Sequence, residues 1–208
     1  MSNFQSLLKE VELIDTTSVD LTSLLSLSKL QTRVPEAEDF EDDLYNLYLP
    51  AAIELVEKTA EIIITEKTYS LFLADFPSYY DFCTIRIEKT PITSVVYLKY
   101  KDADGDWQTI DSGDYELWLN SCPPRIVIPA ENIPSLYQQG TKVVEVQYEG
   151  GYDNMADVPA PQKLILLELV AFWYQNREAF SVRGYPSEGA QGRAFDNLLD
   201  ACRWRVYP

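Results

Sequence analysis

The amino-acid sequence predicts an α+β fold, in which an antiparallel β-sheet domain is inserted between the second and third main helices of a small helical bundle. Two changes of hydrophobic period support this prediction, one near residue 66 and one near residue 150. Apolar residues recur at helical spacing outside these two points and at strand spacing between them. We therefore expect N-terminal helices in 1–66, the β domain in 67–150 and C-terminal helices in 151–208.

The N-terminal part predicts two helices. Residues 11–15 (VELID) suit a short strand, and residues 21–31 suit a short helix that Asp20 or Thr22 caps and that ends before Pro35. A second, long amphipathic helix to about Ile64 is predicted by apolar residues at steps of four, three, four and four: Phe40, Leu44, Leu47, Ala51 and Leu55. Pro50 lies inside this pattern and lacks a backbone donor, so we expect a kink or break near Leu49.

The middle of the chain predicts strands. Alternating or β-branched segments lie at 84–88, 92–101, 115–119, 125–129 and 141–148. The Asp-Ala-Asp-Gly step at 102–105 predicts a hairpin that leads into 107–110. We expect an antiparallel sheet folded into a small sandwich.

The C-terminal part returns to helical spacing. Pro159 and Pro161 suit the start of a helix from about Ala160 to Ala179. Its stretch LELVAFWYQNRE (167–178) is either an ordinary core helix with a charged end or the centre of a bundle and subunit interface, formed by Leu167, Val170, Trp173, Tyr174 and Arg177. A loop with Gly184, Pro186, Gly189 and Gly192 then leads to a short helix over 195–204.

The chain is strongly acidic, with 33 Asp and Glu against 17 Lys and Arg and a formal net charge of −16. Residues 177–208 hold five arginines and four acids, so the first 176 residues carry −17. Such a field repels phosphate backbones and argues against tight nucleic-acid binding, although DNA could still slide past without sticking. The acids between Glu36 and Asp43 suit a solvated helix start or, alternatively, a repulsive lining or docking patch.

The residue types argue against catalysis. The chain has no histidine, which removes Ser-His and Cys-His nucleophiles and histidine metal sites. Its three cysteines, Cys83, Cys122 and Cys202, lie far apart and predict reduced thiols of a cytosolic protein. Residues 102–106 begin like a calcium loop, but Trp107 and Gly113 stand where that loop needs Gly and Glu. We therefore expect no catalytic residues, no metal and no cofactor.

Neither a signal peptide nor a membrane-spanning segment is evident, so we expect no membrane partner. The aromatic residues of the β region suit a sheet core, and the alternative is a stacking platform for sugars: Tyr97, Tyr100, Trp107, Tyr115 and Trp118.

The order of several segments resembles the head–tail connector (adaptor) proteins of tailed bacteriophages. LTSLLSLSKLQTRV and LYLPAAIELVEKTAE resemble the two opening helices of that family, and FPSYYDFCTIRIEKTPITSVVYLKYKDADGDW resembles its inserted β region. VQYEGGYDNMADVPAPQKLILLELVAFWYQNREAF resembles its most characteristic stretch, and FDNLLDACRW its closing segment. The resemblance covers about residues 10–205. Pro50 departs from the family's uninterrupted second helix.

The resemblance implies a structural protein of the virion neck, assembled in the host cytoplasm. Such adaptors form a ring, twelve copies in this family, below the portal protein. The ring continues the DNA channel, and DNA passes through it without specific binding. Stopper or tail-completion proteins attach to it.

On this reading, residues 193–208 predict a portal-docking segment that is loosely ordered in the free subunit. The preceding glycines give it a flexible connection with which to reach a partner. It also has a charge of +1 and side chains typical of interfaces. The docking residues are Arg193, Phe195, Leu198, Leu199, Arg203, Trp204, Arg205, Val206 and Tyr207. Leu198 and Leu199 could instead simply pack onto the bundle.

Two other functions stay open. One is a carbohydrate- or receptor-binding β module of a phage tail or baseplate, which requires exposed, coplanar aromatic side chains. The other is a small hydrolase with paired carboxylates, for which no sequence motif provides an anchor.

Overall fold

The computed structural model describes residues 9–16, 21–37, 41–79, 82–176 and 189–202. These residues form two compact units. We call the first, residues 9–16 with 66–151, the β unit, and the second, residues 21–65 with 152–202, the helical unit. The predicted mixed α+β class is therefore confirmed.

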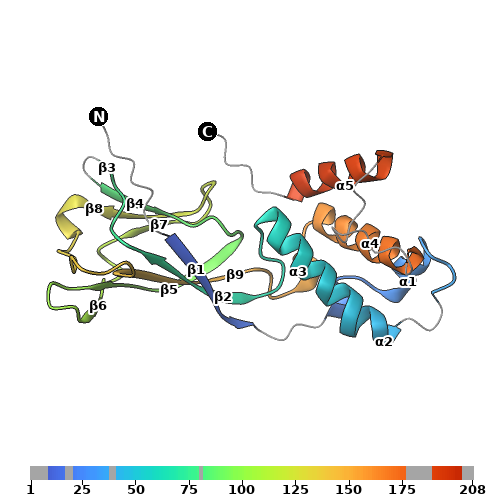
Figure 1. The fold of residues 1–208 in the computed structure, drawn as a ribbon, viewed down its shortest axis with the longest axis horizontal. Helices are drawn as coiled ribbons and strands as arrows, with labels where there is room; N and C mark the ends of the chain where they lie inside the picture. The colour runs from blue at the N-terminus through green and yellow to red at the C-terminus, as the bar shows by residue number, and fades with distance from the viewer. Residues whose placement is uncertain (1–8, 17–20, 38–40, 80–81, 177–188, 203–208) are drawn as a thin grey trace. The chain divides into compact units, whose positions relative to one another are not determined.

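The β unit consists of two antiparallel sheets, which Figure 1 shows as two layers. The five-stranded sheet has the order β1 (Lys9–Thr16), β2 (Lys67–Leu73), β9 (Val144–Gly150), β5 (Ile92–Lys101) and β6 (Trp107–Thr109). The four-stranded sheet has the order β3 (Ser78–Tyr79), β4 (Phe82–Arg86), β8 (Arg125–Pro129) and β7 (Glu116–Trp118). A short 3-10 turn, η3 (Ala130–Asn132), follows β8.

Alternation along β4, β8 and β9 gives each sheet one buried face. Along β9, for example, Val144, Val146 and Tyr148 are fully buried, and the residues between them are half-buried. β4 and β8 bury Cys83, Ile85, Ile126 and Ile128 in the same way. Because successive side chains of a strand point to opposite faces, this pattern fixes which residues reach solvent.

Residues 9–16 lie within the range predicted for the N-terminal helices, but they form β1. This strand pairs with β2, from Lys9 opposite Leu73 to Thr16 opposite Lys67. VELID is thus a strand, as its composition suggested. Its partner lies more than fifty residues away, so local sequence could not assign it to the sheet.

The helical unit contains α1 (Leu27–Gln31), a helical segment from Glu41 to Ala60, α4 (Ala160–Gln175) and α5 (Gly189–Cys202). Two 3-10 turns, η1 (Leu21–Ser23) and η4 (Met155–Asp157), precede α1 and α4. One hydrophobic core joins these helices, and it includes Leu30, Leu49, Leu166, Leu169 and Leu199. The helix predicted over 21–31 is instead two short pieces, although Leu24 and Leu30 are buried as expected.

Pro50 coincides with a change of helix type. The segment begins as α2 (Glu41–Asp43), widens into a π-helix, η2 (Leu44–Tyr48), and continues as α3 (Leu49–Ala60). The Leu49 amide donates to the Leu44 carbonyl five residues back, and Pro50 occupies the first turn of α3, where a missing donor matters little.

The π-helix shifts the buried face by one residue, so part of the predicted apolar face is wrong. Leu44 is buried, but Leu47 is 61% exposed and Ala51 is also exposed. The core positions after the π-helix are Leu49, Ala52, Ile53, Val56 and Ala60. The prediction assumed 3.6 residues per turn throughout, and the wider turn adds one residue to the count.

The second helix ends at Ala60 rather than near Ile64, and a buried carboxylate accounts for the ending. Glu61 adopts the left-handed conformation (φ 56°) that closes many helices. Glu57, only 7% exposed, then accepts hydrogen bonds from the amides of Ile64 (2.8 Å) and Thr65 (3.2 Å). These bonds satisfy backbone donors of the buried segment that follows the helix.

Within the described part of the chain, none of the helices combines the length and the apolar character that crossing a bilayer requires.

Candidate interaction surfaces

Helix α4 is the centre of the helical unit. It begins after Pro159, with Pro161 in its first turn, and it buries one broad face together with Ala171: Gln162, Ile165, Leu166, Leu169, Val170 and Ala171. Apolar residues of its sequence nevertheless lie on nearly all sides, as in a helix that several other elements contact. α1, α3 and α5 all pack against it.

The predicted interface residues of α4 divide into two groups. Val170 is fully buried in the core of its own subunit. Leu167, Trp173 and Tyr174 are half-buried and pack against that core, so each retains some surface for a neighbour. Arg177 lies outside the described residues.

Contacts within the subunit explain why Trp173 and Tyr174 lie so close to the polar end of α4. The Trp173 ring lies 6.4 Å from the Tyr48 ring, centre to centre. The Tyr174 hydroxyl donates to the Glu36 carbonyl (3.1 Å), and Gln175 donates to the Arg33 carbonyl (3.5 Å). Tyr174 thus has its apolar body on the core and its polar tip on the 33–36 segment, while Trp173 packs against Tyr48.

The predicted docking residues also divide. Phe195 and Leu199 are buried in the helical core together with Cys202, Leu198 is half-buried, and Arg193 is exposed. Residues 193–202, expected to be loosely ordered, form the C-terminal part of α5. Gly189 and Gly192, expected in a loop, belong to the same helix. Arg203, Trp204, Arg205, Val206 and Tyr207 lie outside the described residues.

The acidic stretch at 36–43 is only partly described. Glu36, Asp42 and Asp43 are exposed, residues 38–40 lie outside the described part, and the Glu41 side chain is not described. Solvation of the three exposed carboxylates agrees with a helix start, because anions are stabilised near helix N-termini.

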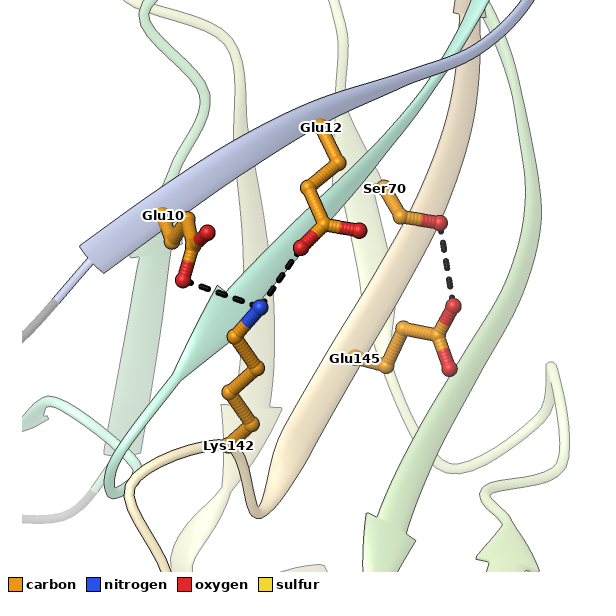
Figure 2. A network of polar contacts seen from close by, with 5 residues as sticks. All are labelled: Glu10, Glu12, Ser70, Lys142 and Glu145. Carbon is orange, nitrogen blue, oxygen red and sulfur yellow. Dashed lines mark hydrogen bonds and ion pairs between the residues drawn. The ribbon is translucent and has the colours of Figure 1, made fainter.

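The outer face of the five-stranded sheet carries a network of paired charges. The Lys142 ammonium lies between two carboxylates of β1, 2.9 Å from Glu10 and 2.5 Å from Glu12 (Figure 2). These carboxylates raise the pKa of Lys142, chiefly through the hydrogen bond to Glu12. Glu145 accepts hydrogen bonds from Ser70 (2.9 Å) and Tyr97 (2.8 Å). A shallow depression beside this network is lined by Lys9, Glu10, Phe72, Thr141 and Lys142.

The carboxylates of this network are engaged by Lys142 and by the hydroxyl groups of Ser70 and Tyr97. Among the described residues, no three or more Cys, Asp or Glu side chains gather in a way that could hold a metal ion. The turn at 102–106 is a hairpin turn, in which Asp102 accepts hydrogen bonds from the amides of Asp104 and Asp106.

Two of the five aromatic residues predicted to form the sheet core are instead exposed. Trp107 on β6 is 42% exposed and Trp118 on β7 is 46% exposed, while Tyr97, Tyr100 and Tyr115 are half-buried. Each tryptophan lies near a cation, Lys101 at 5.1 Å and Arg125 at 4.8 Å from the ring centre. The sequence contains no signal for this exposure, because β6 and β7 are three-residue edge strands whose position depends on the whole sheet.

Comparison with solved structures identifies the fold over nearly the whole chain. A chain from the neck of the empty gene transfer agent particle, determined with C6 symmetry, is 21% identical with a TM-score of 0.64, covering 95% of this chain and 97% of that one. A chain from the native gene transfer agent virion is 19% identical with a TM-score of 0.65, covering 94% and 97%. A chain from the native neck, determined with C12 symmetry, is 19% identical with a TM-score of 0.63, covering 95% and 97%.

No protein-family model and no curated protein sequence matches the chain. At these identities the likeness establishes the fold.

Proposed function

We propose that this chain is an adaptor of the neck of a phage-like particle, where copies of it form a ring below the portal. The observation that carries the proposal is the likeness to neck chains, which spans about 95% of this chain and 97% of theirs. Agreement over both units supports a common role better than a shared single domain would. The C12 symmetry of one of those necks supports a ring of twelve copies.

The adaptor extends the DNA channel and provides the platform for a stopper or tail-completion protein. The charge of the chain supports this part of the proposal, because a net charge of −16 gives DNA no counterion-release attraction to the ring. A passage for DNA requires a surface to which DNA does not adhere. A structural role of this kind also needs no catalytic residue.

In this adaptor most of the β domain is an insertion between the second and third main helices, and β1 joins it from before the first helix. The division of the described residues supports this arrangement, because residues 66–151 belong to the β unit, and the segments before and after them, 21–65 and 152–202, form the helical unit.

Portal docking belongs to the C-terminal end, and the burial of α5 changes how it should be tested. Removal of everything after Gly192 would delete Phe195, Leu199 and Cys202 from the core and unfold the helical unit. Removal of residues 203–208 leaves these side chains in place. If the shortened protein folds but no longer binds portal, the docking role is supported, and normal binding would exclude it.

Electron microscopy of the chain mixed with the portal protein of its own particle tests the proposed function. We expect a ring of this chain on one end of the portal. A chain that stays monomeric and never binds portal would contradict the proposal.

The alternative of a carbohydrate- or receptor-binding β module is favoured by one observation, the exposure of Trp107 and Trp118. They lie on edge strands of different sheets, however, and no strand pairing joins them. Specific binding to a glycan array would support this alternative.

A further inference from the structure

The outer side of the four-stranded sheet carries a surface that we call the Arg–Trp face: Phe82, Arg86, Trp118 and Arg125. Arg86 of β4 lies directly opposite Arg125 of β8, and Arg125 lies opposite Trp118 of β7. The Arg125 guanidinium lies 4.8 Å from the Trp118 ring centre, and the Trp118 indole donates to Glu116 (3.0 Å). The tryptophan is therefore held between two contacts while 46% of it remains exposed, and Phe82 is 42% exposed.

The two arginines of this face have no carboxylate partner in the described part of the chain. Arg125 donates to the Ser121 hydroxyl at 3.4 Å, and the Arg86 side chain makes no hydrogen bond or ion pair there. The nearby Lys9 amine donates to the Arg86 backbone carbonyl. It also pairs with the Glu88 carboxylate (2.9 Å), so that carboxylate is engaged by Lys9 rather than by Arg86. Like charges directly opposite each other destabilise a sheet, so folding does not explain this pair.

An acidic turn on the five-stranded sheet has the opposite charge to the Arg–Trp face. Residues 102–106 join β5 to β6 and contain three aspartates. Asp102 shapes the turn by accepting from the amides of Asp104 and Asp106 and from Gln108 (2.8 Å). Gly105, at φ 92°, supplies the left-handed position. The Asp104 and Asp106 side chains are exposed on this ordered support.

We propose that the Arg–Trp face binds the acidic turn of a second copy of this chain, and that this contact closes the ring. The inference rests on the proposed function. Two guanidinium groups meet two carboxylates, and the exposed Trp118 supplies apolar area beside Arg125, in residue types that dominate interfaces. Because the two surfaces lie on different sheets, the contact is head-to-tail, which is the type that generates rings.

Paired charge reversal tests the contact. Variant A is Arg86→Glu with Arg125→Glu, and variant B is Asp104→Lys with Asp106→Lys. Each variant places like charges across every contact with itself, so we expect neither to form rings, with self-association weakened by at least about a hundredfold. In an equimolar mixture every A–B contact joins opposite charges, so alternating rings should form again.

The control for variant A is Lys29→Glu with Lys58→Glu, which changes the net charge equally at exposed positions of the helical unit. It should form rings as the wild type does. Circular dichroism should show all variants folded, because every altered side chain lies at the surface or partly so.

Electron microscopy and native mass spectrometry, with and without portal, read the outcome. Rings that form in the mixture but in neither variant alone establish the contact. If wild type forms rings and the mixture does not, or if either variant alone still forms them, this inference is wrong while the proposed function stands. If the wild-type chain forms no ring even on portal, both this inference and the proposed function are wrong.

Discussion

Glu57 is the buried side chain on which the exit from α3 depends. Replacing it with alanine leaves the amides of Ile64 and Thr65 without their acceptor, so we expect the free energy of unfolding to fall by about 1–3 kcal/mol. Glu57→Gln, which keeps an acceptor oxygen, should lose less. Glu54→Ala, an exposed change on the same helix, is the control for urea unfolding. Equal effects at positions 54 and 57 would refute the capping role.

For two tyrosines of the β unit, we expect loss of the hydroxyl to change stability in different ways. The buried Tyr148 hydroxyl has no hydrogen-bond partner in the described part of the chain, so Tyr148→Phe should leave stability unchanged or raise it. Tyr97→Phe removes the bond to Glu145 and should lower stability by about 0.5–1.5 kcal/mol. Thermal unfolding of the two variants compares them directly. The reverse order would show that the Tyr148 hydroxyl is satisfied in solution.

The three thiols should differ sharply in reactivity. Burial raises the pKa of Cys83 from its ordinary value near 9 to about 12, with a smaller contribution from Asp75, and burial raises that of Cys202 to about 11. Only thiolates react, so at pH 8 we expect iodoacetamide to modify the exposed Cys122 and to spare the other two until the chain unfolds. Mass spectrometry of the labelled peptides measures this.

The same pKa shifts predict how the stability of the folded chain changes at alkaline pH. A raised folded-state pKa means that ionisation favours the unfolded chain, so stability should fall as pH rises from about 9 toward 12. A Cys83→Ala variant should show a weaker fall. An unchanged pH profile would mean that Cys83 does not contribute.

Helix α5 belongs to the helical core as firmly as the central helix does. Leu199→Ala should destabilise the helical unit by about 2–5 kcal/mol, because a fully packed leucine is replaced by a cavity. Asn197→Ala, two residues away and exposed, should have little effect. Urea denaturation monitored by circular dichroism compares the two variants. Equally small effects of the two changes would show that α5 is only loosely attached to the helical core.

Among the elements, those with strong local patterns were predictable and those that depend on distant partners were not. β5, β8 and α4 were placed close to their observed bounds, because alternation or a proline-led apolar run identifies each of them. β2 was not singled out and β1 was only suggested, since β1, β2 and β9 form their ladders across long sequence separations. The exposure of Trp118 likewise depends on which strands flank it.

The candidate interaction surfaces were predictable only in part, for a related reason. Composition identified Trp, Tyr and Arg as interface residue types, but it could not distinguish a surface residue from a core residue in a helix such as α5. Phe195 and Leu199 were placed among the docking residues, and packing against α4 buries them. The Arg86–Arg125 pair has no signal in the sequence, because cross-strand register brings the two residues together.

The charge of the whole molecule sets its behaviour toward DNA. With a net charge of −16, we expect no binding of duplex DNA at physiological salt, because no release of counterions offsets the repulsion between like charges. Fluorescence anisotropy with labelled duplex measures this. Variant A, which replaces the two arginines of the Arg–Trp face, shows whether they contribute to any residual signal. Salt-sensitive binding in the micromolar range would argue against a passage for DNA.

The π-helix before Pro50 also governs which insertions and deletions the chain should tolerate. Leu44 and Leu49 are both fully buried although they are five positions apart, so this stretch holds one residue more than an ordinary α-helix needs between two core contacts. A deletion of one residue between them should convert the stretch to regular α-helix with both leucines still inward. An alignment of relatives should therefore place a one-residue gap here, in the middle of a helix, where gaps are otherwise rare.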